Sequence, residues 1–296
     1  MSEENQGRSL QEAVGYQFQA TATTYDEKDA ALYALSIGAS EDPLDTDDLQ
    51  YTYELAPSGF NCFPTFAATF PLQTMEQIGS IPNQKLNLME VLHGEHYLEL
   101  SRPLPATSTI INQAKISQVY DKGSGALIVV DISSTDQEGR SVALNRASLF
   151  VRGRGNFGGE RGPSSRSDGP PQRVADEVLG EKTTDNQALL YRLASGDRNP
   201  LHADTRFAAL LGYPRPILHG LCTYGYAARA VLKSFAGNNP DHFKSIKARF
   251  SSHVFPGETI ETEMWQMSAT RIMFRSRVIE RDEIVLTNGI VTLQSG

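Results

Sequence analysis

Residues 30–38 read AALYALSIG, and residues 188–196 read ALLYRLASG. In both stretches apolar side chains recur every three to four positions and a glycine follows, which predicts a short helix that ends at that glycine. Tyr33 and Tyr191 hold equivalent places 158 residues apart, which is close to half of the 296-residue chain. A recurrence at this spacing indicates an internal duplication.

The tails of the two halves also agree, because each ends in three strand-like segments. They span residues 107–120, 126–133 and 142–151 in the first half, and residues 258–266, 271–279 and 283–293 in the second. The segment 271–279 alternates apolar and polar side chains, as a half-buried strand does. Short turns rich in Gly and Asp separate the segments, which favours an antiparallel sheet in each half.

A long apolar segment precedes the strands of the second half. Residues 220–235, GLCTYGYAARAVLKSF, are apolar around most of a helical circumference. A helix of this kind is buried, so we expect a sheet to curl around it. The first half has a weaker counterpart at residues 64–78, which Pro71 interrupts. The sequence therefore predicts an α+β fold built twice, with an antiparallel sheet around a central helix and a degenerate N-terminal helix.

A segment rich in Gly, Pro and Ser divides the two halves at residues 152–172. Its composition is typical of a linker or a long surface loop. The expected organisation is an N-terminal repeat at residues 1–151, this linker, and a C-terminal repeat at residues 173–296.

Composition and charge narrow the class of protein. Hydrophobic residues make up 40% and charged residues 21%, which suffices for a packed core and excludes disorder of the whole chain. The net charge of −8 argues against nucleic acid as a partner. No run reaches the ~20 apolar residues of a membrane span, and residues 1–11 are polar, unlike a signal peptide. Two cysteines, Cys62 and Cys222, exclude a disulfide scaffold and indicate a reducing, intracellular compartment.

The segment 195–202, SGDRNPLH, carries the clearest chemical signal. Asn199 and Pro200 favour a turn, which can bring the side chains of Asp197 and His202 to one cavity. Together an Asp and a His can hold and polarise a water, because one accepts its proton while the other donates or orients. Asn199 would fix the loop or orient the carboxylate. The structural alternative is that Asp197 supports the turn and His202 begins the next helix.

The repeat favours the chemical interpretation. At the spacing of 158 residues, Asp197 falls on Ala39 and His202 falls on Leu44, so the first half lacks the pair. If the fold required both side chains, both copies would be expected to have them. We therefore expect the chemistry in the C-terminal half alone.

A second candidate lies at the start of the predicted buried helix, where Gly220 follows His219. The first peptide N–H groups of a helix lack intrahelical partners and lie at its positive end. Because Gly220 has no side chain, a thioester oxygen could approach these groups closely. A plain helix start would have the same sequence.

Local charge supplies a third feature. Five cations lie within 21 residues, namely Arg229, Lys233, Lys244, Lys247 and Arg249. They suit a phosphate-bearing ligand, or else a solvated helix end and strand face. The other histidines, namely His93, His96, His242 and His253, show no spacing typical of metal ligands, so no metal site is expected.

With these residues identified, the chain resembles the hydratase 2 family. These are the (3R)-specific enoyl-CoA hydratases related to MaoC-like dehydratases, which also form the hydratase part of peroxisomal multifunctional enzyme type 2. The resemblance rests above all on YRLASGDRNPLHADTRFA at residues 191–208, PILHGLCTYGYAARAVL at 216–232 and VLHGEHYLELSRPLP at 91–105. It extends from Tyr16 to Thr292.

The resemblance implies a double hot-dog fold in which the C-terminal repeat is catalytic and the N-terminal repeat accommodates long acyl chains. It assigns catalysis to Asp197 and His202, with Asn199 in support and the Gly220 N–H stabilising the thioester oxygen. Acyl-CoA contacts are implied at His93, Gly94, Lys122, Arg198, Pro200, Leu201 and Phe250. The family further implies a homodimer, no metal, and no cofactor beyond the CoA of the substrate.

The implied reaction is the reversible hydration of trans-2-enoyl-CoA to (3R)-3-hydroxyacyl-CoA in fatty acid β-oxidation. Three alternatives stay open: a hot-dog acyl-CoA thioesterase, a non-catalytic acyl-CoA or lipid-binding module, and a dehydratase for acyl chains on a carrier protein. The family suggests peroxisomes, and otherwise the cytoplasm, although the chain ends in Leu-Gln-Ser-Gly and not in a Ser-Lys-Leu-type signal. The chain could also be one domain of a larger multifunctional enzyme.

Overall fold

The structure is a computed structural model that describes residues 10–84, 86–163 and 169–294. The first nine residues, residues 164–168 of the predicted linker and the last two residues of the chain lie outside this description. Within the described ranges, no helix combines the length and the apolar character needed to cross a bilayer.

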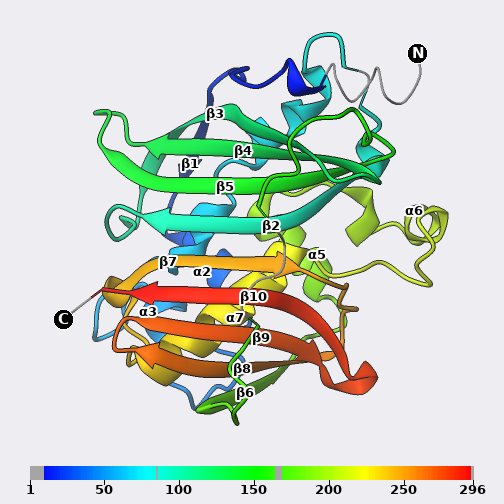
Figure 1. The fold of residues 1–296 in the computed structure, drawn as a ribbon. Coiled ribbons are helices and arrows are strands. Elements are labelled where there is room, and N and C mark those ends of the chain that lie inside the picture. Colours follow the sequence, from blue (N-terminus) through cyan, green and yellow to red (C-terminus); the bar gives the residue numbers. More distant parts are fainter. Residues whose placement is uncertain (1–9, 85, 164–168, 295–296) are drawn as a thin grey trace.

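The described strands form one continuous antiparallel sheet (Figure 1), in the order β1-β3-β4-β5-β2-β7-β10-β9-β8-β6. Their bounds are Thr21–Tyr25 (β1), Val91–Leu100 (β2), Ser108–Asp121 (β3), Gly125–Thr135 (β4), Ser141–Arg152 (β5), Glu177–Lys182 (β6), Phe243–Phe250 (β7), Thr259–Ser268 (β8), Arg271–Val278 (β9) and Glu283–Leu293 (β10). Read from its outer edge, each half has the same order, β1-β3-β4-β5-β2 in the first and β6-β8-β9-β10-β7 in the second, and the halves join where β2 pairs with β7. This repeated order confirms the duplication. The edge strands β1 and β6 were not predicted, because they are short and carry many exposed polar side chains.

The helices lie on one face of the sheet (Figure 1). Their bounds are Glu27–Ser36 (α2), Leu49–Thr52 (α3), Leu72–Met75 (α4), Gln187–Ser195 (α5), Thr205–Leu210 (α6) and Gly220–Phe235 (α7). Helix α7 is buried from Leu221 to Leu232, as its apolar circumference predicts, and packs against the strands of the second half. Its counterpart in the first half is broken into the 3-10 turn Pro64–Ala68, the single helical turn α4 and the 3-10 turn Glu76–Ser80. The prediction of a degenerate N-terminal helix is therefore confirmed.

The two helices of the opening repeat are neighbours. Helices α2 and α5 pack together, and the rings of Tyr33 and Tyr191 lie with their centroids 6.1 Å apart. One large apolar core runs through both halves, from Phe63 and Phe70 in the first to Tyr224 and Ile246 in the second. The halves therefore form one packed unit.

The predicted linker begins as a packed surface loop. The Asp121 carboxylate accepts the backbone N–H groups of Asn156 and Gly158, each at 2.9 Å, and Phe157 is buried. The Lys122 ammonium donates to the carbonyls of Arg161 and Pro163. These contacts fix the first part of the segment on the β3–β4 turn.

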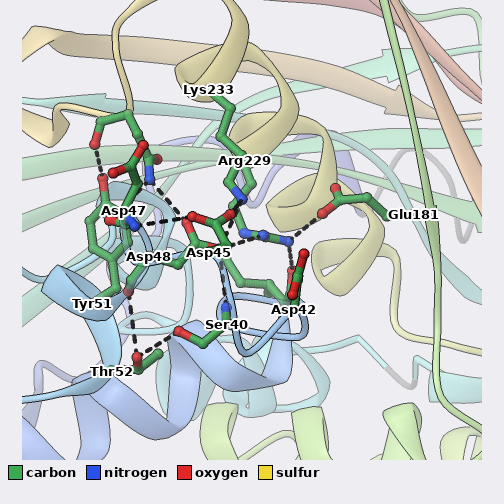
Figure 2. Close-up of polar contacts among 12 residues, drawn as sticks. Ser40, Asp42, Asp45, Asp47, Asp48, Tyr51, Thr52, Glu181, Arg229 and Lys233 are labelled. Carbon is green, nitrogen blue, oxygen red and sulfur yellow. Dashed lines mark hydrogen bonds and ion pairs between the residues drawn. The ribbon is translucent and has the colours of Figure 1, made fainter.

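An ion-pair network joins α7 to the first half (Figure 2). Arg229 is only 2% exposed, and its guanidinium lies 2.9 Å from Asp48 and 2.8 Å from Glu181. Lys233 contacts Asp45 at 2.6 Å and Asp48 at 3.0 Å. Burial raises the pKa of Asp48, but Arg229, the Ser40 N–H and Lys233 outweigh it, so that this pKa lies below its usual value.

This network overturns both sequence interpretations for Arg229, whereas Lys244 and Lys247 do lie on a partly exposed strand face, with side chains 39% and 42% exposed. Arg229 neither faces solvent nor is free to bind a phosphate, because carboxylates of the first half and of β6 already occupy it. Lys244 and Lys247 also pair across the junction of the halves, with Glu99 and Glu95 on β2. Sequence spacing could not show these partners, since the carboxylates lie more than 40 residues away.

Candidate active site

The loop after α5 is wound into a tight turn. Gly196 has φ +76°, a left-handed conformation that favours glycine, and closes the helix. An Asp197 carboxylate oxygen accepts the Asn199 N–H at 2.9 Å, and the Asn199 side-chain oxygen accepts the Leu201 N–H at 3.1 Å. The 3-10 turn Pro200–His202 follows. The turn predicted at Asn-Pro is therefore present, and the Asn199 side chain holds it.

His202 has a fixed tautomer. Its Nδ1 lies 2.8 Å from the carbonyl oxygen of Ile217. Because a carbonyl only accepts, Nδ1 carries the hydrogen and Nε2 is left as an acceptor. Burial lowers the pKa of His202, and Asp197 and the Ile217 carbonyl offset this only in part. His202 is therefore neutral at pH 7 and its Nε2 can accept a proton.

A second histidine, His219, stands in the same site. A carboxylate oxygen of Asp197, a ring nitrogen of His202 and a ring nitrogen of His219 all lie within 4.8 Å of one another. The two imidazoles are stacked, with centroids 3.7 Å apart and planes inclined by 26°. Burial, together with His202 and Arg192, lowers the pKa of His219 well below its usual value. The sequence signal was the HG dipeptide, which drew attention to Gly220 alone.

Two histidines and a carboxylate are also the ligand types of zinc. A zinc ion must lie in the plane of each imidazole, ~2.0–2.1 Å from its nitrogen. The stacked planes of His202 and His219 are nearly parallel, so both lone pairs cannot point to one ion unless a ring rotates. Hydrogen bonds of ~2.8 Å are longer than zinc bonds and tolerate a larger departure from the ring planes, so the arrangement suits a water better than a metal.

The first residue of α7 contacts a residue that was predicted to bind the substrate. Gly220 is the first residue of α7, and a Cβ atom there would lie 2.9 Å from Cδ1 of Phe250. Any larger residue at position 220 would displace the Phe250 ring. The imidazole of His93 lies 5.0 Å from the same ring, and Gly94 follows at a bulge of β2. Three predicted regions, on α7, β7 and β2, therefore meet here.

His93 is the first of three side chains that hydrogen bonds connect in series. Its Nε2 lies 3.3 Å from Nδ1 of His96, whose Nε2 lies 3.0 Å from the Asn145 side-chain oxygen. Burial lowers the pKa of His93 to about 3 and that of His96 to about 4. Both imidazoles are neutral at pH 7, so this chain adds no charge near the site.

The remaining predicted residues lie in the loop itself or on the β3–β4 turn. Lys122 lies in the β3–β4 turn, where burial and the nearby Arg249 lower its pKa. Pro200 is exposed and Leu201 is half-buried in the 3-10 turn. Arg198 lines a cavity of about 570 Å³, which lies within the usual range of ligand pockets.

That cavity connects the loop to the first half. Residues that flank Asp197, among them Ser195 and Gly196, form one wall. The opposite wall comes from β1 and from the broken helix of the first half, and includes Thr23, Tyr25, Phe66, Phe70 and Leu72. A smaller cavity of about 320 Å³ lies at the Arg229 network. Asp197 and His202 line neither cavity, but Gly196 and Arg198 on either side of Asp197 line the larger one.

Comparisons with known proteins agree with this arrangement. The family model of the MFE-2 hydratase 2 N-terminal domain matches residues 23–153, and that of the MaoC like domain matches residues 166–288. A probable enoyl-CoA hydratase 2 of Dictyostelium discoideum is 41% identical over 90% of this chain and 90% of its own. The peroxisomal multifunctional enzyme type 2 of Mus musculus is 42% identical over 95% of this chain, which spans 38% of that longer enzyme.

Solved structures show the same fold. A MaoC-like dehydratase from Phytophthora capsici superposes with a TM-score of 0.84 at 33% identity, over 97% of both chains. A Mycobacterium tuberculosis protein solved as a double hot-dog fold superposes with a TM-score of 0.59 at 15% identity, over 95% of this chain and 96% of its own. The predicted double hot-dog fold is confirmed, and the chain belongs to the hydratase 2 family of MaoC-like proteins.

Proposed function

We propose that this chain is a hydro-lyase that reversibly hydrates trans-2-enoyl-CoA to (3R)-3-hydroxyacyl-CoA. The observation that carries the proposal is the pairing of a carboxylate, Asp197, with a neutral histidine, His202. A carboxylate oxygen and a ring nitrogen of the pair lie within 4.8 Å of each other, and Nε2 is the free acceptor of the His202 ring. Two acceptors so close together can each accept a hydrogen bond from the same water. The names of the Dictyostelium relative and of an Arabidopsis thaliana relative, both enoyl-CoA hydratase 2, support enoyl-CoA as the substrate class.

The reaction begins with a water held between Asp197 and His202. Its oxygen forms a bond to C3, one of its protons passes to the Asp/His pair, and the C2–C3 double bond becomes a thioester enolate. The proton then returns to C2 on the same face, so that one water adds in total. Dehydration follows the same steps in reverse.

The enolate oxygen needs a hydrogen-bond donor as its charge develops. The backbone N–H of Gly220 at the positive end of α7 supplies that donor, in keeping with the helix geometry. The absence of a side chain leaves this N–H open to the thioester beside Phe250. Asn199 acts by holding the loop, since its side chain caps the 3-10 turn.

The acyl chain would enter the cavity of about 570 Å³ beside the loop. Its far wall belongs to the N-terminal half, where a continuous central helix is missing, so this repeat supplies room for long chains. His93, Gly94 and Phe250 would contact the thioester end, and Lys122 the CoA. We extend the proposal to the peroxisome and to a place in a larger enzyme, on the name and length of the mouse relative. The homodimer stays an expectation of the family.

Two substitutions test the function directly. Asp197→Asn and His202→Ala are each expected to lower kcat for trans-2-decenoyl-CoA by roughly 10²–10⁴-fold, since each removes a proton acceptor. Loss of the enoyl absorbance measures hydration, and release of free thiol would instead reveal a thioesterase. Asp204→Asn is the matched control, because Asp204 caps α6 on the surface of the same segment. Hydration by either variant at the wild-type rate would refute the assignment.

A further inference from the structure

Two buried polar side chains beside the catalytic loop lack protein partners. Within the described part of the chain, neither ring nitrogen of His219 nor the hydroxyl of Tyr191 makes a hydrogen bond. His219 is 2% exposed and Tyr191 is 1% exposed. Buried polar atoms of folded proteins nearly always have a partner, so these atoms point to a solvent molecule or a substrate group.

His219 shares a small space with Asp197 and His202, and Tyr191 lies beside His219. A His219 nitrogen lies within 4.8 Å of an Asp197 carboxylate oxygen and of a His202 ring nitrogen, and the Tyr191 ring lies 4.9 Å from the His219 ring. A water with hydrogen bonds of ~2.8 Å in tetrahedral directions holds its partners ~4.6 Å apart. Three groups within 4.8 Å of one another can therefore share one water.

We propose that His219 is a third catalytic residue, which donates a hydrogen bond to the reacting water, and that the Tyr191 hydroxyl positions His219 through a bound water. This inference rests on the proposed hydration. It adds to that proposal a group that sets the direction in which the water reacts.

The hydrogen bonds of the water follow from the tautomers. Its two hydrogens go to the Asp197 carboxylate and to Nε2 of His202, since both are acceptors. A neutral imidazole has one N–H, so His219 can donate to one lone pair of the water oxygen. Only the second lone pair is then free, and it must point at C3. Three partners thus leave the nucleophile a single direction of attack.

The same donor serves the reverse reaction. When the C3–O bond breaks, the departing hydroxyl takes a proton from the Asp/His pair, and the His219 N–H stabilises its oxygen. Because the overall equilibrium does not depend on the enzyme, loss of His219 lowers kcat/KM in both directions by the same factor.

Two substitutions separate hydrogen bonding from packing. His219→Phe keeps a ring that can stack on His202 but removes both nitrogens, whereas His219→Gln keeps an N–H donor without the ring. We expect His219→Phe to lower kcat for trans-2-decenoyl-CoA roughly 10- to 100-fold with little change in KM, as a misdirected nucleophile does. His219→Gln is expected to retain several times more activity.

Tyr191→Phe removes a single oxygen atom and keeps the test decisive even if His219→Phe does not fold. We expect a fall in kcat of roughly 3- to 10-fold, again with little change in KM. Tyr226→Phe is the matched control, because the Tyr226 hydroxyl is also buried without a partner but lies beside Gly38, away from the loop.

The outcomes are distinguishable. The inference is supported if His219→Gln, which keeps an N–H donor, retains more of kcat than His219→Phe, which has none, while the thermal midpoints of both variants are unchanged. It is overturned if His219→Phe keeps wild-type kcat, if His219→Gln loses as much as His219→Phe, or if Tyr191→Phe and Tyr226→Phe behave alike. If the wild-type protein does not hydrate enoyl-CoA at all, the proposed function itself has failed.

Discussion

Replacement of Arg229 by methionine should lower the free energy of unfolding more than any surface substitution, because Arg229 connects the two halves. The guanidinium is buried between Asp48 of the first half and Glu181 of β6, and it also donates to the Ile37 carbonyl at 3.0 Å. Methionine fills much of the same volume without the charge. The variant would therefore leave the two carboxylates without their shared cation (Figure 2).

The size of the effect follows from burial. Removal of one partner of a buried ion pair costs about 3–5 kcal/mol, because the other charge stays desolvated. Lys233 remains 3.0 Å from Asp48, so the lower end of the range, about 3 kcal/mol, is expected. At ~2–4 °C per kcal/mol for a chain of this size, the thermal midpoint should fall by roughly 6–12 °C.

The assay is equilibrium unfolding in urea, followed by circular dichroism, with thermal midpoints as a second measurement. Arg275→Met is the matched control, since Arg275 on β9 also pairs with a carboxylate, Glu263, but is 37% exposed. An exposed pair contributes about 0–1 kcal/mol. If Arg229→Met loses no more stability than Arg275→Met, the reasoning about the buried network is wrong.

Three further predictions concern the site and its surroundings. Gly220→Ala should lower kcat at least 10-fold in the hydration assay, because the new methyl would lie 2.9 Å from the Phe250 ring, and a second change of Phe250→Leu should restore part of the loss. In the folded protein the pKa of His96 is about 4, against ~6.5 in the unfolded chain. The contribution of His96 to the free energy of unfolding is therefore complete above pH 6.5. About 3 kcal/mol of it is lost as the pH falls to 4, because the unfolded chain takes up a proton that the folded protein does not. Urea unfolding at several pH values should show this slope, and His96→Gln should flatten it; equal slopes would contradict the assignment. Leu72→Trp should narrow the cavity and lower kcat/KM for decenoyl-CoA at least 10-fold while crotonyl-CoA turnover stays within twofold, and equal losses for both substrates would place the acyl chain elsewhere.

Much of the fold could be predicted from the sequence because it is recorded in local patterns. The recurring helix with its glycine, the strand alternation and the apolar circumference of α7 each depend on neighbours a few residues away. The duplication then supplied the global arrangement. The edge strands β1 and β6 escaped prediction, because their pairing depends on partners that are distant in the sequence.

The part of the site that depends on neighbouring residues could also be predicted. Asp197 and His202 share one turn, so their meeting follows from local geometry. His219 belongs to the site because His202 is hydrogen-bonded to the Ile217 carbonyl and because the two imidazoles stack. Neither contact corresponds to a fixed spacing in the sequence. Arg229 was misread for the same physical reason, since its partners come from other segments of the chain.

The central claim is that a water directed by Asp197 and His202 adds to one face of the enoyl group. The most direct test is chiral analysis of the product formed by the wild-type protein from trans-2-decenoyl-CoA. We predict (3R)-3-hydroxydecanoyl-CoA, with no release of free thiol. A (3S) product would contradict the account.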